Sequence, residues 1–270
     1  MKNILITLGC SFTHGDGCYD YSILEQSPFN SREYSKLNDT EKQLFYQLNQ
    51  NNFLNKGWPS QLQEMLGFDE LYNLGIGGAA NSQSVKIFMD ELYYRDFENS
   101  NVVVIWLHGF HHRISFYNDG VVKSYSHDSK LHNEYIREIS DINTDTRLET
   151  YFYLKLMKEL CNNKNWKFLY TSIKSNDIQY FNEYYHNDIL LDNFMNISIP
   201  WPVNKSNKSK ICAHPNELGY TDIAKTIYDW IQVSDIKIPN KHIDSYIKEA
   251  VFQTRKSFNI NVELDNTEEI

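Results

Sequence analysis

The chain has 270 residues, of which 41% are hydrophobic and 23% are charged, a balance typical of one globular domain with a sizeable core. Its net charge is −9, from 35 acidic and 26 basic residues, and no block of Lys and Arg concentrates positive charge. We therefore expect no nucleic-acid partner, because binding to a phosphate backbone depends on clustered cations.

The N-terminal sequence and the spacing of the cysteines indicate the cellular compartment. A predicted strand begins within about three residues of the N-terminus, which leaves no room for a signal peptide. No apolar run approaches the roughly 18 residues that a membrane-spanning helix needs. The four cysteines, at positions 10, 18, 161 and 212, show no CxxC spacing. These features predict a cytoplasmic protein with reduced thiols and no membrane partner.

Apolar runs that alternate with amphipathic stretches predict an α/β fold with a parallel, doubly wound sheet. We expect strands at 3–8, 70–73, 101–107 and 166–171, and a hairpin between 114 and 126 around an Asp-Gly turn. We expect helices at 41–48, 59–66, 81–92, 149–161, 220–232 and 241–256. Three of them are expected to bury apolar stripes: Leu62, Met65 and Leu66; Phe152, Leu156 and Leu160; and Ile223, Ile227 and Ile231.

Two polar segments interrupt this alternation, at 18–55 and 110–143. We interpret both as insertions that border the site, and the first has too little periodicity to form a core of its own. The predicted organisation is one domain over 1–235 with these two insertions. A helical extension that ends in an acidic tail then follows over 236–270.

The first predicted strand ends at Gly9-Cys10-Ser11-Phe12-Thr13-His14-Gly15, which places Ser11 at the carboxyl edge of the sheet. Ligands of open α/β folds bind at that edge, so Ser11 is a candidate nucleophile. A serine hydroxyl needs a base, and His214 lies in a proline-stiffened turn just before the last helix of the domain. A turn serine and an ordinary loop histidine are the structural alternatives.

Three segments in order, Gly9–Thr13, Asn73–Asn81 and His214–Tyr220, closely resemble the blocks of the SGNH (GDSL-type) hydrolase family. The resemblance implies a three-layer α/β/α sandwich with a roughly five-stranded parallel sheet. It implies a cofactor-free esterase or deacetylase that acts on small acyl esters or acylated glycans, here of a cytoplasmic or phage type. In this family Ser11 would be the nucleophile and His214 the base, and the backbone N–H groups of Ser11 and Gly77 would form the oxyanion hole.

The chain departs from the family pattern at two places. The Gly-x-Asn expected after the third strand is Trp106-Leu107-His108 here, so His108 or Asn81 would have to donate to the oxyanion. The aspartate expected three residues before the base is Ile211, so a backbone carbonyl or a distant acid would have to orient the imidazole of a Ser-His dyad. These departures keep open an alternative class of protein, a carbohydrate- or partner-binding module that kept the fold and lost the chemistry.

Two other kinds of site have weaker support. Residues 75–80 match the dinucleotide fingerprint, but they follow the second strand, and the acidic residue about 20 positions on, Glu98, lies at the end of a helix. His108, His111 and His112 could hold Zn²⁺, but adjacent histidines point apart in an extended chain. We therefore expect no nucleotide and no metal, and the oligomeric state stays open.

Overall fold

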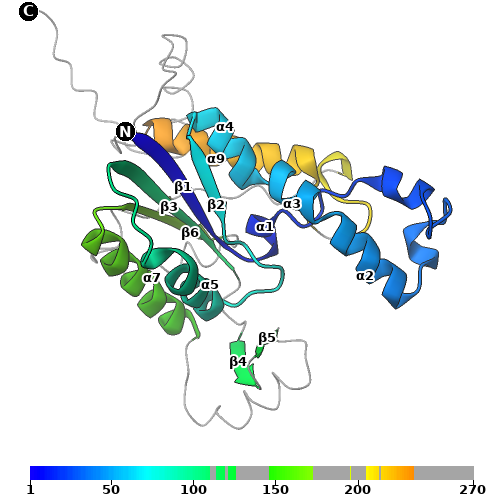
Figure 1. Ribbon diagram of the computed structural model, residues 1–270, viewed down its shortest axis with the longest axis horizontal. Coiled ribbons are helices and arrows are strands. Elements are labelled where there is room, and N and C mark those ends of the chain that lie inside the picture. The colour runs from blue at the N-terminus through cyan, green and yellow to red at the C-terminus, as the bar shows by residue number, and fades with distance from the viewer. Residues whose placement is uncertain are drawn as a thin grey trace, which may run out of the picture.

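The computed structural model describes residues 1–109, 114–118, 121–125, 146–172, 195, 205–212 and 214–233. These residues form a parallel sheet between two layers of helices, which confirms the expected three-layer α/β class (Figure 1). The sheet comprises β1 (Lys2–Gly9), β2 (Glu70–Asn73), β3 (Ser100–His108) and β6 (Lys167–Ser172). Its order is β2-β1-β3-β6, and the described part of the chain contains these four of the roughly five expected strands.

The central strands β1 and β3 are buried on both faces, so their apolar residues alternate between two cores. Ile4, Ile6 and Leu8 belong to one core, and Leu5 belongs to the other. This alternation follows from the two-residue period of a strand. The pairing of β1 with β3 runs from Lys2 opposite Ser100 to Gly9 opposite Leu107, so both strands end at the same edge.

Among the described residues, two main helices cover each face of the sheet (Figure 1). On one face lie α4 (Trp58–Leu66) and α9 (Glu217–Val233), and on the other lie α5 (Asn81–Phe88), which a π-helical turn η3 (Met89–Tyr93) continues, and α7 (Thr146–Asn163). Pro59 occupies the first turn of α4 and Gly67 ends that helix, as predicted. The stripe predicted for the last helix, Ile223, Ile227 and Ile231, is buried.

The buried face predicted for α7 is wrong. Phe152 is 59% exposed and Leu156 is 42% exposed, whereas the residues that face the sheet are Tyr151, Leu154, Met157 and Cys161. The helix carries two interleaved apolar stripes. The stripe that starts at Tyr151, whose members are three, three and four residues apart, is the one that contacts the sheet. Of the predicted set, Leu160 packs partly against this core.

The segment 18–55 forms a small core of its own, contrary to the sequence-based expectation. Phe29, Leu37 and Phe45 are buried together, and Tyr19 stacks on Phe45. Large aromatic side chains supply this core from turns as well as helices, so helical periodicity does not reveal it. The segment contains η1 (Tyr21–Glu25), η2 (Tyr34–Lys36), the predicted α2 (Asp39–Leu48) and an additional helix α3 (Gln50–Lys56).

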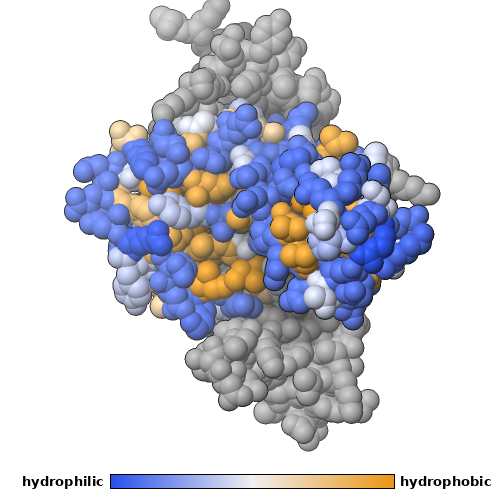
Figure 2. Space-filling model, turned by 45° about the vertical axis from the view of Figure 1, so that its right-hand side comes forward, coloured by the Kyte–Doolittle hydropathy of each residue, from blue (hydrophilic) through white to orange (hydrophobic). Residues whose placement is uncertain are grey.

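The predicted hairpin is present as antiparallel β4 (Ile114–Asn118) and β5 (Val121–Tyr125). The rest of the insertion 110–143 and the predicted extension 236–270 lie outside the described residues. None of the helices that the structure describes combines the length and apolar character needed to cross a bilayer. Figure 2 shows a mostly hydrophilic surface on which apolar side chains are exposed toward the middle of the face in view.

Candidate active site

The first element of the site is the sharp turn between β1 and the one-turn helix α1 (Ser11–His14). Gly9 has φ +150°, and a Cβ there would lie 2.2 Å from Thr13 Oγ1 and 2.4 Å from the carbonyl oxygen of Leu107. Only glycine fits this position, because any side chain would overlap the neighbouring strand. The turn therefore places Ser11 directly beyond the carboxyl end of the central strand.

Ser11 and His214, which are 203 positions apart in sequence, meet at this edge. The distance between Ser11 Oγ and His214 Nε2 is 2.8 Å, within the normal range of a hydrogen bond. Ser11 is buried, and the ring of Phe12 packs against the imidazole with centroids 5.4 Å apart. The structure thus brings together the two residues that the sequence analysis predicts as nucleophile and base.

The loop that carries His214 is fixed at the start of α9. Asn216 Oδ1 accepts the N–H of Gly219 at 3.1 Å, and the His214 carbonyl accepts the N–H of Ser209 at 3.0 Å. Gly17, with φ +112°, lets the segment after α1 approach this loop, since a Cβ there would lie 2.1 Å from the carbonyl oxygen of Pro215. The loops of the serine and the histidine are therefore packed directly against each other.

The other ring nitrogen of His214 faces a sulfur atom. His214 Nδ1 lies 3.3 Å from Cys212 Sγ, and Cys212 is half-buried. Ile211, which occupies the place of the family's aspartate, packs instead against the small core of Phe29, Leu37 and Phe45. The insertion 18–55 thus uses position 211 as an apolar anchor, which explains physically why an acid is missing there.

Asp16 connects several parts of the site. Its Oδ1 lies 2.5 Å from His14 Nδ1 and accepts a hydrogen bond of 3.0 Å from the hydroxyl of Tyr46. Its backbone N–H donates to the carbonyl of Ser11 at 3.0 Å, and its own carbonyl accepts the hydroxyl of Tyr220 at 2.7 Å. Asp16 therefore links the serine turn to the insertion and to α9.

The loop between β2 and α5 lies against the serine turn. Asn73 holds both, because its Nδ2 donates to the carbonyl of Thr13 at 2.9 Å and its Oδ1 accepts the N–H of Gly75 at 3.0 Å. Gly77 lies beside Asp16, where an added Cβ would lie 3.0 Å from Asp16 Oδ2. At Gly78, with φ +78°, an added Cβ would meet nothing within 4 Å. The role of the Gly77 N–H as an oxyanion donor stays a prediction.

Asn81 is the first residue of α5, and the N-cap residue is Ala80. The buried amide of Asn81 spans two elements: Oδ1 accepts the N–H of Gly109 at 3.0 Å, and Nδ2 donates to Thr150 Oγ1 at 3.0 Å. The N–H of Gly109 can only donate, so it fixes the orientation of the amide. The structure therefore shows Asn81 as a link between β3 and α7.

His108 ends β3 and is buried. Its ring packs against Trp106 with centroids 6.4 Å apart, and both residues are on the strand face that α5 and α7 cover. The proposed donor role of His108 stays a prediction, and His111 and His112 lie outside the described residues.

Several supporting residues could not be identified from the sequence. Asp16, Tyr46 and Tyr220 act through contacts between segments that are far apart in the chain, whereas Cys212 contacts a residue only two positions away. Asn73 was part of a recognised motif, but its side-chain contacts required the register of β1 with β2. The only sequence signal for Cys212 and Asp16 was their closeness to His214 and Ser11.

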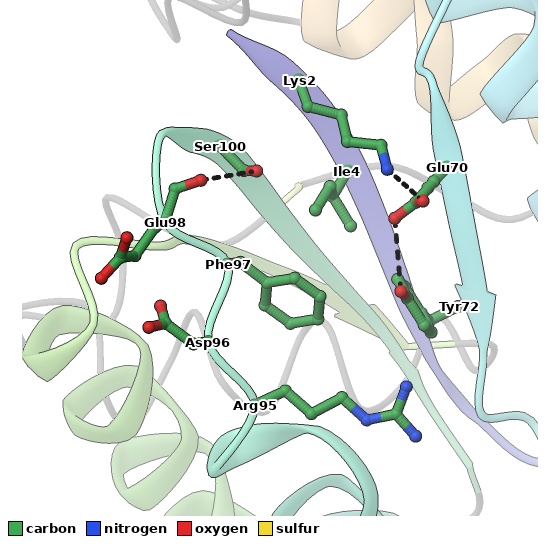
Figure 3. Close-up of a pocket in the computed structure, with 9 residues that line it drawn as sticks. All are labelled: Lys2, Ile4, Glu70, Tyr72, Arg95, Asp96, Phe97, Glu98 and Ser100. Atoms are coloured by element: carbon green, nitrogen blue, oxygen red, sulfur yellow. Dashed lines mark hydrogen bonds and ion pairs between the residues drawn. The ribbon is translucent and has the colours of Figure 1, made fainter.

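A pocket of about 710 Å³ lies at the opposite end of the sheet, where the strands begin (Figure 3). In Figure 3, Lys2 points toward Glu70 and pairs with it, and Tyr72 donates to the same carboxylate at 3.2 Å. The guanidinium of Arg95 lies over the Tyr72 ring at 5.6 Å. Because Ser11 follows the carboxyl end of β1, this pocket is separate from the Ser11–His214 pair.

No protein-family model and no curated protein matches the chain. Similar solved structures include a protein of the lipolytic G-D-S-L family from Desulfitobacterium hafniense DCB-2, at 13% identity and a TM-score of 0.43, covering 84% of this chain and 98% of that one. Another is the lipase Lip_vut3 from a goat rumen metagenome, at 12% identity and a TM-score of 0.41, covering 85% and 97%.

Proposed function

We propose that this protein is a serine-dependent ester hydrolase in which Ser11 is the nucleophile and His214 the general base. The observation that carries the proposal is the 2.8 Å contact between Ser11 Oγ and His214 Nε2 at the carboxyl end of the central strand. A serine and an imidazole within hydrogen-bond distance form the minimal unit for activating a hydroxyl nucleophile. The sequence resemblance supplies the substrate class, small acyl esters or acylated glycans.

The proposed reaction uses this pair twice. His214 Nε2 takes the proton of Ser11 Oγ–H as the oxygen attacks the ester carbonyl, and the imidazolium then gives that proton to the departing alkoxide. Water, deprotonated by the same nitrogen, attacks the resulting acyl enzyme and releases the acid together with free Ser11. Backbone N–H groups, with those of Ser11 and Gly77 as the proposed donors, would stabilise the tetrahedral oxyanion.

Hydrolysis of p-nitrophenyl acetate at near-neutral pH, with and without a chelator, tests the proposal. We expect activity that survives the chelator in the native protein and is lost in Ser11→Ala. Ser100→Ala is the matched control, because Ser100 begins β3 at the opposite end of the sheet. A fluorophosphonate probe should label the native protein and the control but not Ser11→Ala. Equal hydrolysis by the native protein and Ser11→Ala, or none by either without any labelling, would contradict the proposal and favour the binding module.

A further inference from the structure

We infer that Cys212 is a positioning residue for His214, its sulfur accepting the Nδ1–H of the imidazole. This inference rests on the proposed function of the Ser11–His214 pair. The chain of contacts that supports it runs from Ser11 Oγ to Nε2, 2.8 Å, and from Nδ1 to Cys212 Sγ, 3.3 Å.

The protonation state of the imidazole follows from its partner at Nε2. To accept the Ser11 proton, Nε2 must carry a lone pair, so a neutral His214 has its proton on Nδ1. That proton faces the sulfur of Cys212, which is an acceptor, although a weak one. The contact therefore favours the tautomer that catalysis needs, and it strengthens when the ring becomes an imidazolium, because the donor is then charged.

The fold of the loop explains why position 212 has this role. Lys208 and Pro215 form a bridge and Ser209 N–H donates to the His214 carbonyl, so residues 209–214 form a closed turn. Within this turn the side chains of Cys212 and His214 meet, whereas Ile211 points into the small core of the insertion. A carboxylate at position 211 would therefore be directed away from Nδ1.

The test compares Cys212→Ala with Cys212→Asp, using hydrolysis of p-nitrophenyl acetate. Loss of one weak hydrogen bond should lower kcat roughly fivefold to tenfold in Cys212→Ala with KM unchanged. Cys212→Asp should restore kcat to at least the native value, since a carboxylate is a stronger acceptor for the same N–H. Cys161→Ala is the matched control: it deletes a buried thiol on the face that α7 covers and should leave kcat unchanged.

A measurement that does not require turnover accompanies the kinetics. The ¹⁵N NMR shifts of the His214 ring should report the Nδ1–H tautomer in the native protein and in Cys212→Asp, and a mixture of tautomers in Cys212→Ala. Circular dichroism establishes that each variant is folded. Because this readout needs no substrate, it tests the role of Cys212 even if the chosen ester is a poor one.

The outcomes separate this inference from the proposed function. Loss of activity in Ser11→Ala together with a native kcat and tautomer in Cys212→Ala would overturn the role of Cys212 and leave the hydrolase proposal standing. Full activity in Ser11→Ala would overturn the hydrolase proposal itself. The inference would also be overturned if adding Ile211→Asp to Cys212→Ala restored kcat while Cys212→Asp had a low kcat. That result would assign the positioning role to residue 211.

Discussion

The hydroxyl of Tyr21 accepts the backbone N–H of Lys210 at 3.1 Å, and so joins the insertion 18–55 to the loop that carries His214. The same hydroxyl lies 3.3 Å from Ser209 Oγ, and the Lys210 ammonium lies 5.4 Å from the centre of the Tyr21 ring. Together with the packing of Ile211 on the insertion, these contacts fix the histidine loop from outside. The insertion thus belongs to the framework of the site.

Tyr21→Phe should therefore affect catalysis more than stability. The Lys210 N–H is exposed enough to bond water, so the free energy of unfolding should fall by no more than about 1 kcal/mol. The looser loop should lower kcat several-fold. Ester hydrolysis and urea denaturation measure the two effects, with Tyr94→Phe as the control because that side chain is 77% exposed on the other side of the sheet. A native kcat in Tyr21→Phe would show that the loop holds its shape without this contact.

Asn81→Ala should destabilise the fold. The substitution leaves the buried N–H of Gly109 without its acceptor and Thr150 without its donor, a loss of about 1–3 kcal/mol. Thr150→Ala removes the second contact but spares the bond to Gly109, and it should cost less. Urea denaturation of both variants measures the difference. Equal losses would indicate that the bond to Gly109 contributes little, and an unchanged stability with a large fall in kcat would instead support the oxyanion role expected from the sequence.

The sequence predicted the layers of the fold and the meeting of Ser11 and His214, because both depend on local signals. The apolar run of β3 and the glycine-rich turn after β1 can each be recognised from a few consecutive residues. The block at His214 can be recognised from its composition. The buried face of α7 could not be predicted in this way, because two apolar stripes satisfy the same helical period. Packing against the sheet decides which of the two stripes is buried. The role of Cys212 likewise depends on the closed turn around it and on where Ile211 packs.

Alkaline pH should destabilise this protein through its buried tyrosines. Burial raises the pKa of Tyr19 above its ordinary value, and the nearby carboxylate of Asp16 raises it further. Above the ordinary tyrosine pKa of about 10 the unfolded chain loses this proton while the folded chain keeps it. The folded state then binds more protons, so the stability is full below that pH and falls as the pH rises, by up to about 1.4 kcal/mol per unit for each such group.

Tyr19→Phe should make this decline less steep. Unfolding free energies from urea titrations at pH 8, 9.5 and 10.5 measure the slope, and Tyr94→Phe serves as the exposed control. The ring of Phe should keep the stacking on Phe45 and the edge contact with Phe53, so the stability at pH 8 should stay close to native. An unchanged slope in Tyr19→Phe would mean that other buried tyrosines, Tyr170 and Tyr220 among them, account for the alkaline sensitivity.

The hydrogen bond from Tyr46 to Asp16 should be measurable as a coupling between the insertion and the serine turn. The Asp16 side chain is only 10% exposed, so its bond to the Tyr46 hydroxyl is poorly replaced by water. In a double-mutant cycle of Asp16→Ala and Tyr46→Phe we expect a coupling free energy of about 1.5 kcal/mol, as for a hydrogen bond to a charged group. The single variants should also lower kcat, because the side-chain bond of Asp16 helps to fix the segment whose backbone N–H donates to the Ser11 carbonyl.

The control cycle pairs Tyr46→Phe with Asp90→Ala, an exposed residue of η3 that bonds Lys86 on the opposite face of the sheet. Effects of residues without shared partners add, so this second cycle should give no coupling beyond the experimental error. An additive Asp16–Tyr46 cycle would show that the insertion stabilises the site through its other contacts, those of Tyr21, Phe53 and Ile211 among them. A coupling in the free energy of unfolding without a fall in kcat would show that Asp16 stabilises the fold but does not position Ser11.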